Sequence, residues 1–174
     1  MTKNLIAYFS RKGNNYVGGS IVNLPVGNTE VIARKIQKMA GGDMFRIETV
    51  KAYPADYKAT TEVAKDEKRA NARPELVGKV AGMGKYEVLI LGFPNWCGTM
   101  PMAVAAFLEA YDLSGKTILP YCTHEGSGLG TSGSDIRNLC PDAKVLPGLA
   151  IVGGSVAGAD KAVEGWLMKA GLKS

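Results

Sequence analysis

Three short stretches of the chain combine residue types that bind ligands. The first places the Ser10 hydroxyl after an apolar run and, further along, residues 27–29 (Gly-Asn-Thr) directly before a helical pattern. Free backbone N–H groups and the helix dipole at such a start favour an anion, above all a phosphate. The same residues also suit a plain helix cap, so both interpretations stay open at this point. The stretch is not a P-loop, because no Gly-Lys-Ser/Thr follows a spaced glycine.

The second stretch, residues 94–99, runs Pro-Asn-Trp-Cys-Gly-Thr between an apolar run and a helical pattern that opens at Pro101. It places Trp96 on a tight loop at the carboxyl end of a buried strand, where ligands bind in open α/β sheets. A flat ligand could lie on the indole there, although a core tryptophan is the alternative. Cys97 has no histidine in its loop, so we do not interpret it as a nucleophile.

The third stretch, residues 123–128, runs Thr-His-Glu-Gly-Ser-Gly and is too rich in glycine for regular structure. Its glycines allow backbone N–H groups to approach the edge of a ligand closely. A flexible surface loop is the alternative. His124 is the only histidine of the chain, and we expect an exposed loop residue rather than a catalytic base. Together the three stretches suit a flat heterocycle that carries a phosphate.

Alternating apolar strands and helical patterns must position these stretches. The expected strands are residues 5–9, 43–50, 86–93, 116–123 and 144–152, with a brief further strand at 20–24, and the expected helices are 30–39, 57–71, 102–108, 134–140 and 160–170. Asn28 or Thr29 is the expected N-cap of the first helix. Five strands that alternate with helices predict a parallel, doubly wound α/β sheet with right-handed crossovers, in one domain over residues 1–174. Its ligand crevice should collect the strand ends at Ser10, Pro94 and Thr123.

The composition is that of a globular protein and argues against several kinds of partner. Of 174 residues, 46% are hydrophobic and 21% are charged, and the net charge of +5 comes without an arginine-rich run, so we expect no nucleic-acid partner. No apolar segment approaches the ~20 residues of a membrane helix, and the first residues lack the pattern of a signal peptide, so we expect a cytoplasmic protein without a membrane partner. Three cysteines without metal-ligand spacing favour reduced thiols.

Over nearly its full length the chain resembles the flavodoxin family. Residues 8–10 (Tyr-Phe-Ser), followed by 27–29, are similar to the family's phosphate loop, and residues 123–128 are similar to the loop at the pyrimidine end of the flavin. The most specific motif is residues 92–101, Gly-Phe-Pro-Asn-Trp-Cys-Gly-Thr-Met-Pro, which is similar to the loop that flanks the isoalloxazine. The resemblance implies a flavodoxin-like three-layer sandwich, with a five-stranded parallel sheet in the order 2-1-3-4-5 and helices on both faces. It also implies FMN as the cofactor.

The loop positions and the resemblance together assign a set of residues to the cofactor. They are Ser10, Arg11, Gly27, Asn28, Thr29, Pro94, Asn95, Trp96, Cys97, Gly98, Thr99, Thr123, His124, Glu125, Gly126, Ser127 and Gly128. No catalytic residue and no metal ligand is assigned. The resemblance further implies a peptide in the second loop that turns over when the flavin is reduced, and only Gly98 there takes a positive φ without strain.

The chain departs from the family pattern in three respects. Sixteen residues, 11–26, separate Ser10 from the Gly-Asn-Thr motif, where the family pattern has two. Residues 10–14 (Ser-Arg-Lys-Gly-Asn) fit the compact spacing as well, but we favour residues 27–29 because the helix begins directly after them. The insertion could fold over the flavin, with Tyr16 in contact. The third loop lacks the tyrosine that many flavodoxins stack on the ring, and the chain is basic where flavodoxins are usually acidic.

These features favour an FMN-binding electron carrier over two alternatives. One alternative is an FMN-dependent reductase that uses a nicotinamide donor and a quinone or similar acceptor, so whether the protein is an enzyme stays open. The other is a non-redox binding module that uses the same crevice. A receiver domain would need an acidic cluster after the first strand, where this chain has Ser10, Arg11 and Lys12. The expected partner is a redox protein or a small-molecule electron donor or acceptor, and the sequence names neither.

Overall fold

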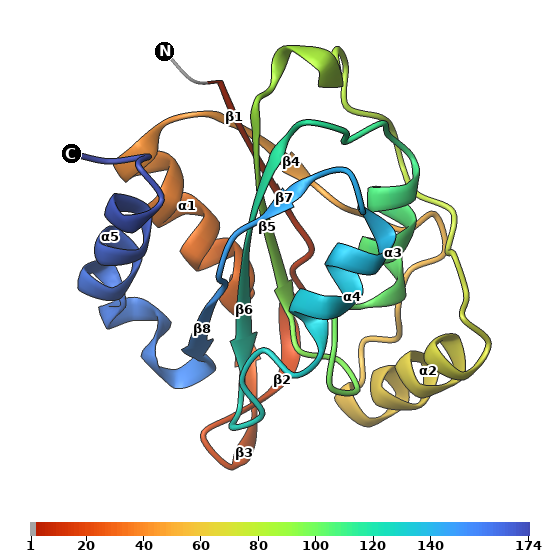
Figure 1. Cartoon of the computed structure of the whole chain (residues 1–174). Coiled ribbons are helices and arrows are strands. Elements are labelled where there is room, and N and C mark those ends of the chain that lie inside the picture. Colours follow the sequence, from red (N-terminus) through yellow and green to blue (C-terminus); the bar gives the residue numbers. More distant parts are fainter. Residues whose placement is uncertain (1–2) are drawn as a thin grey trace.

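A parallel sheet forms the centre of the computed structural model, which describes residues 3–174 (Figure 1). Its strands are β1 (Asn4–Tyr8), β4 (Asp43–Arg46), β5 (Val88–Pro94), β6 (Thr117–His124), β7 (Lys144–Val145) and β8 (Leu149–Val152). They are arranged in the order β4-β1-β5-β6, and β7 and β8 pair one after the other with the outer edge of β6. If β7 and β8 count as one strand, this is the predicted order 2-1-3-4-5.

The fifth strand is interrupted, which corrects the prediction of one strand over residues 144–152. Leu146 still donates its N–H to the carbonyl of Ile118 at 2.9 Å, but Pro147 has no N–H to donate. Pairing resumes at Leu149, opposite Tyr121. The proline therefore divides the edge strand into two short pieces.

Helices cover both faces of the sheet, as predicted. The helices are α1 (Asn28–Ala40), α2 (Tyr57–Arg69), α3 (Met102–Glu109), α4 (Ser132–Leu139) and α5 (Asp160–Lys169), with short 3-10 turns η1 (Met83–Lys85) and η2 (Gly153–Gly158). Figure 1 shows α1 and α5 on one face and α3 and α4 on the other. None of these helices is long and apolar enough to cross a membrane, within residues 3–174.

The central strands are buried on both faces, which explains why their apolar residues do not alternate. All five residues of β1 and the first six of β5 are buried. Leu89 and Leu91 pack toward α3 and α4, whereas Val88 and Ile90 pack toward α1 and α5. Two apolar layers, one on each side of the sheet, therefore hold the loops at its carboxyl edge in place.

The residues inserted after β1 form an antiparallel hairpin of β2 (Gly13–Val17) and β3 (Ser20–Leu24). Its strands are joined by Gly18 and Gly19, both at positive φ, as tight two-residue hairpin turns require. The strand at 20–24 was predicted, but its partner was not, because the glycine and asparagines of residues 13–15 are typical of turns. In Figure 1 the hairpin extends beyond the carboxyl ends of the sheet.

A close contact between β5 and β6 fixes the start of α1. The Tyr121 ring lies across Gly92, its neighbour in register, and the fully buried Tyr121 hydroxyl donates to the Thr29 carbonyl at 3.0 Å. A Cβ atom on residue 92 would lie 2.1 Å from Cζ of Tyr121. Only glycine leaves room for this arrangement, so the sheet itself positions the first turn of α1.

We therefore expect Gly92→Ala to lower the free energy of unfolding by about 1–3 kcal/mol, because the added methyl group overpacks the site and displaces the Tyr121 ring. Denaturant unfolding measures this change. Gly165→Ala is a matched control: residue 165 lies within α5 with no neighbouring atom within 4 Å of the added Cβ. The control should be neutral or stabilising by up to about 1 kcal/mol. Equal effects of the two substitutions would contradict the role of Gly92.

Candidate functional site

A cavity of about 480 Å³ opens at the carboxyl edge of the sheet. Three loops that follow β1, β5 and β6 surround it, together with the hairpin and the first residue of α2. Its walls are formed by Arg11, Asn15, Tyr16, Asn28, Thr29, Tyr57, Pro94, Asn95, Trp96, Thr123, His124, Glu125, Gly126 and Ser127. The crevice predicted from the strand ends is therefore present, and all three stretches contribute to it.

The insertion leaves and rejoins the sheet edge at a contact between Ser10 and Gly27. A Cβ atom on residue 27 would lie 2.2 Å from Oγ of Ser10 and 2.8 Å from the Arg11 carbonyl oxygen. The Ser10 hydroxyl accepts the N–H of Glu30 at 3.1 Å. Gly27, not Asn28 or Thr29, is the N-cap of α1, and as a glycine it has no side chain to form a capping bond. Ser10 and the start of α1 thus meet although sixteen residues intervene.

The alternative register, residues 10–14, leads to a different helix. The side-chain oxygen of Asn14 accepts the N–H of Tyr57 at 2.7 Å, at the start of α2. Asn14 is therefore engaged with the start of α2 rather than with α1. The placement supports residues 27–29 as the ones that meet Ser10 at the start of α1.

Two hydroxyl groups meet at the floor of the cavity. Oγ1 of Thr29 and Oγ1 of Thr123 lie 2.9 Å apart, and both residues are nearly fully buried. One hydroxyl donates to the other, so the accepting hydroxyl keeps a proton of its own for a further partner. The cavity therefore contains a hydroxyl donor beside the first turn of α1.

Arg11 is the one arginine or lysine in the cavity wall, within the part of the chain that the structure describes. Its guanidinium donates to the main-chain carbonyls of Asn14, of Pro54 at 3.0 Å and of Ala55 at 2.5 Å. Burial lowers the pKa of Arg11 from its ordinary value, with a smaller opposing effect of Asp56. Since all these acceptors are neutral, a positive charge remains at the cavity without an ion-pair partner among residues 3–174.

Trp96 is half-buried and forms part of the cavity wall. Its ring meets Phe9 and Tyr53 edge to face, with centroids 5.1 and 5.0 Å apart. The two aromatic residues hold the indole from behind, so the alternative of a core tryptophan is partly correct. The indole therefore has fixed orientation as well as access to the cavity.

The loop after Trp96 is a tight hairpin turn. Trp96 and Thr99 exchange backbone hydrogen bonds of 2.8 and 3.2 Å, and both central residues, Cys97 and Gly98, have positive φ. Gly98 was predicted to tolerate such a φ, but Cys97 shares it, at 56°. The Gly98 carbonyl accepts the N–H of Thr131 at 2.8 Å, which joins this loop to the start of α4.

The third loop is more ordered in its contacts than a flexible surface loop would be. The Gly126 N–H, expected to face a ligand, donates instead to Nδ1 of His124 at 2.9 Å. His124 is half-buried rather than exposed, which corrects the prediction. The Glu125 carboxylate accepts the N–H of Gly18 at 2.7 Å and of Gly153 at 3.1 Å. It thereby connects the tip of the hairpin to η2 at the wall of the cavity.

The sequence missed two residues of the wall, Asn15 and Tyr57, and named Tyr16 only as a possible contact. Tyr16 and Tyr57 stack with centroids 5.9 Å apart. The sequence did not indicate Tyr57, because the polar residues of its helix do not show which face is turned toward the protein. Six assigned residues lie near the cavity but not in its wall: Ser10, Gly27, Cys97, Gly98, Thr99 and Gly128.

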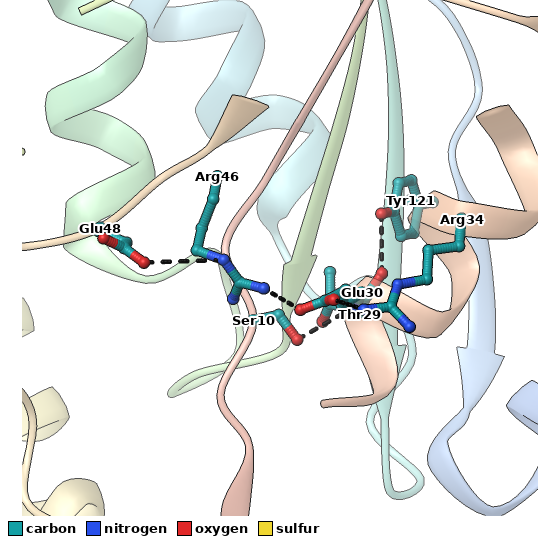
Figure 2. A network of polar contacts seen from close by, with 7 residues as sticks. All are labelled: Ser10, Thr29, Glu30, Arg34, Arg46, Glu48 and Tyr121. Carbon is teal, nitrogen blue, oxygen red and sulfur yellow. Dashed lines mark hydrogen bonds and ion pairs between the residues drawn. The ribbon is translucent and has the colours of Figure 1, made fainter. Parts of the chain in front are cut away.

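A buried carboxylate lies behind the start of α1 (Figure 2). Glu30, whose side chain is 10% exposed, forms ion pairs with Arg34 and Arg46, and Arg46 also approaches Glu48 at 3.7 Å. None of these charged groups is in the cavity wall. Burial alone would raise the pKa of Glu30, but the hydrogen bonds and charges of Arg46 and Arg34 outweigh it and lower that pKa. The network ties α1 to β4 next to Ser10.

The flavodoxin family profile matches residues 3–170 of this chain. The chain belongs to the flavodoxin family. No curated protein matches it in sequence. Among solved structures, a Bacteroides eggerthii protein assigned as a flavoprotein is 26% identical, with a TM-score of 0.77 over 97% of this chain and 98% of that chain.

Two further structures share the flavodoxin fold with this chain. A Bacteroides uniformis protein, also assigned as a flavoprotein, is 23% identical with a TM-score of 0.73 over 96% of this chain and 98% of its own. A Lactobacillus acidophilus flavoprotein solved in complex with FMN is 20% identical with a TM-score of 0.67, over 91% of this chain and 98% of its own. At these identities the likeness establishes the fold.

We expect Glu30→Gln to destabilise this flavodoxin at pH 7 by about 1.5–3 kcal/mol, because hydrogen bonds to a charged group are lost. The lowered pKa sets the pH dependence. The stabilisation is fully present above the ordinary value of 4.5 and is lost as pH falls through the lower folded value. Denaturant unfolding between pH 7 and pH 3 measures both effects.

The variant and the parent should therefore approach each other in stability as the pH falls. The control is Glu62→Gln in α2, where the carboxylate is 67% exposed and, among residues 3–174, pairs with Lys65 alone. That substitution should change stability by less than about 0.5 kcal/mol at every pH. A constant gap between Glu30→Gln and the parent down to pH 3 would contradict the assignment.

Proposed function

We propose that the protein binds FMN in the 480 Å³ cavity and uses it for electron transfer. The observation that carries the proposal is the joining of Ser10, Arg11 and the start of α1 at one end of the cavity with Trp96 in its wall. Family membership supports it, and so does the FMN complex of the Lactobacillus acidophilus protein. Pockets of this size bury most of a ligand of FMN's dimensions.

The donor groups at the start of α1 fit a phosphate. Within residues 3–174, the N–H groups of Asn28 and Thr29 have no acceptor, since the first intrahelical bond runs from Val31 to Gly27. The Ser10 oxygen accepts from Glu30, so its own proton is available to donate. With the Arg11 guanidinium and the positive end of the helix dipole, these groups would hold a dianion.

The remaining walls fit a flat ring. Trp96 offers an aromatic surface that Phe9 and Tyr53 keep in one orientation. The stacked pair of Tyr16 and Tyr57 supplies aromatic surface elsewhere in the wall, in a family where the third loop often supplies a tyrosine. FMN, when bound, supplies the redox chemistry, and the protein residues bind it, orient it and limit its contact with water.

We expect FMN to bind roughly a hundredfold more tightly than riboflavin, because charge-assisted hydrogen bonds to the phosphate are about twice as strong as neutral ones. Ser10→Ala and Thr29→Val should each weaken FMN about tenfold while changing riboflavin little. Quenching of flavin fluorescence measures both affinities. The control Thr117→Val removes a hydroxyl at the opposite end of β6 and should leave both affinities unchanged.

Equal affinities for FMN and riboflavin in the parent protein would exclude a phosphate site at α1. If Ser10→Ala and Asn14→Ala weaken FMN while Thr29→Val does not, residues 10–14 hold the phosphate instead. If Trp96→Phe and Trp96→Ala leave affinity and quenching unchanged, Trp96 serves only as a core residue against Phe9 and Tyr53.

Such a protein could have either of two roles. It could be an electron carrier between proteins, or a reductase with small-molecule partners. The hairpin favours the reductase. It is attached on one side through Arg11 and Asn14 to the segment before α2 and on the other through Gly18 to Glu125. Even a transient redox complex, which buries less than about 1,200 Å² in total, needs its partner close to the cofactor. A hairpin that lines the cavity and is anchored at both ends limits that approach. Small molecules are not obstructed in this way.

We therefore expect NADH or NADPH to bleach the absorbance of the bound flavin directly, at a rate on the order of 1–10 s⁻¹ typical of enzymes. Stopped-flow absorbance under anaerobic conditions measures this rate, with free FMN at the same concentration as the control. A flavin that dithionite bleaches, but neither nicotinamide does within minutes, would identify a carrier. If the protein binds no FMN, the non-redox binding module becomes the favoured function.

A further inference from the structure

A smaller cavity of about 230 Å³ lies beside the main one, on the α2 side of Trp96. The two share Arg11, Asn15, Tyr57, Asn95 and Trp96, so they are adjacent. The walls that belong to the smaller cavity alone are Thr60, Thr61, Ala64 and Lys65 of α2, and Cys97. We call it the side cavity. Nothing in the proposed phosphate and ring sites accounts for it.

The side cavity has the size and walls of a site for one substituted aromatic ring. A buried cavity of about 150 Å³ binds benzene, so 230 Å³ leaves room for a ring with a substituent. Trp96 and Tyr57 offer aromatic faces, and Ala64 and Thr60 are almost completely buried within α2. Aromatic rings pack well against such faces. A flexible aliphatic chain would gain less from these walls.

The charged groups around the side cavity are cations. Arg11 donates only to carbonyl groups, and Lys68 donates to the carbonyl of Cys97 at 2.5 Å. Lys65 pairs with Glu62 at 3.3 Å, but both side chains are more than half exposed, so the pair contributes little. Among the residues that the structure describes, no carboxylate lines the side cavity or the adjoining hollow of Lys65, Lys68, Arg69 and Cys97.

We propose that the side cavity binds a monocyclic aromatic acid next to the flavin. The ring would lie between α2 and the Trp96 loop, and its acid group would face Lys65, which lines the side cavity and not the main one. The proposal deepens the proposed function by naming the class of small molecule that reaches the flavin. It rests on that function only for the use of the ligand, because the walls and charges of the side cavity exist without FMN.

The test compares two probes of equal shape, p-toluate and its neutral analogue p-methylbenzyl alcohol. Each is titrated into the full chain, with and without saturating FMN, and binding is followed by two-dimensional amide NMR. We expect p-toluate to shift the amide signals of Ala64 and Lys65 and to bind more tightly than the alcohol. The fit of shift against concentration gives both affinities.

Two variants test separately the effect of the size of the side cavity and the effect of the charge of Lys65. Ala64→Leu fills the side cavity and should weaken p-toluate at least about tenfold, because the added side chain occupies the space of the ring. Lys65→Gln should weaken p-toluate about two- to fivefold and leave the alcohol unchanged, which is the range expected for an exposed charge pair. The control is Lys58→Gln, on the same helix but in neither cavity wall, which should change neither probe. If Ala64→Leu does not fold, Lys65→Gln and the neutral probe still decide the matter.

Three results would overturn the proposal. One is no shift at Ala64 and Lys65 with p-toluate, and another is equal affinity for the two probes. The third is a loss of FMN affinity in Ala64→Leu, which would make the side cavity part of the flavin site. Failure of the proposed function looks different: FMN does not bind the parent protein, whereas p-toluate still shifts Ala64 and Lys65.

Discussion

The contact between Ser10 and Gly27 is the constraint on which the site depends. The absent Cβ of residue 27 allows the chain after β1 and the start of α1 to meet at a distance that no other residue permits. Sixteen residues leave the sheet and return at this point, and their antiparallel pairing from Gly13–Leu24 to Val17–Ser20 closes the loop locally. Because closure entropy grows slowly with loop length, an insertion of this size adds little cost once its ends are fixed.

The distribution of charge around α1 follows from the same contact. Glu30 donates its N–H to Ser10, and its carboxylate forms ion pairs with Arg34 and Arg46. Two guanidinium groups are therefore held behind the cavity rather than in it. Buried ion pairs contribute little net stability after desolvation, but they fix geometry when each partner is satisfied. At the start of α1 the cavity is left with backbone N–H groups, hydroxyls and Arg11, whereas the carboxylate in its wall, Glu125, accepts the N–H groups of Gly18 and Gly153. That set favours an anion of defined position over a diffuse accumulation of charge.

Much of the fold could be predicted because its signals are local. The apolar runs of β1 and β5, the glycine stop after α1 and the Pro94–Gly98 loop each identify an element without knowledge of its neighbours. The division of the fifth strand also had a local signal, Pro147, which the prediction did not use. The parallel arrangement of the strands then brings the three loops to one edge, whereas the strand order was implied by the resemblance to the flavodoxin family.

The parts of the site that escaped prediction arise from tertiary contacts. Tyr57 enters the wall because the side chain of Asn14 binds the start of α2, and Asn15 enters because it folds back on the carbonyls of Arg11 and Gly13. No periodicity marks such contacts. The Gly126 N–H likewise donates to His124, and this bond depends on the orientation of the imidazole ring.

These contacts also explain why one insertion can influence two cavities. Arg11 and Asn15 stand at the base of the hairpin and line both the main cavity and the side cavity, while Tyr16 stacks on Tyr57, which lines both as well. The distal end of the hairpin is held by Glu125, which lines the main cavity but not the side cavity. The hairpin thus acts as a shared wall that is anchored at both ends. A change in its length or anchoring would alter the main cavity and the side cavity together, so an insertion there can change which molecules enter both cavities while the sheet stays unchanged.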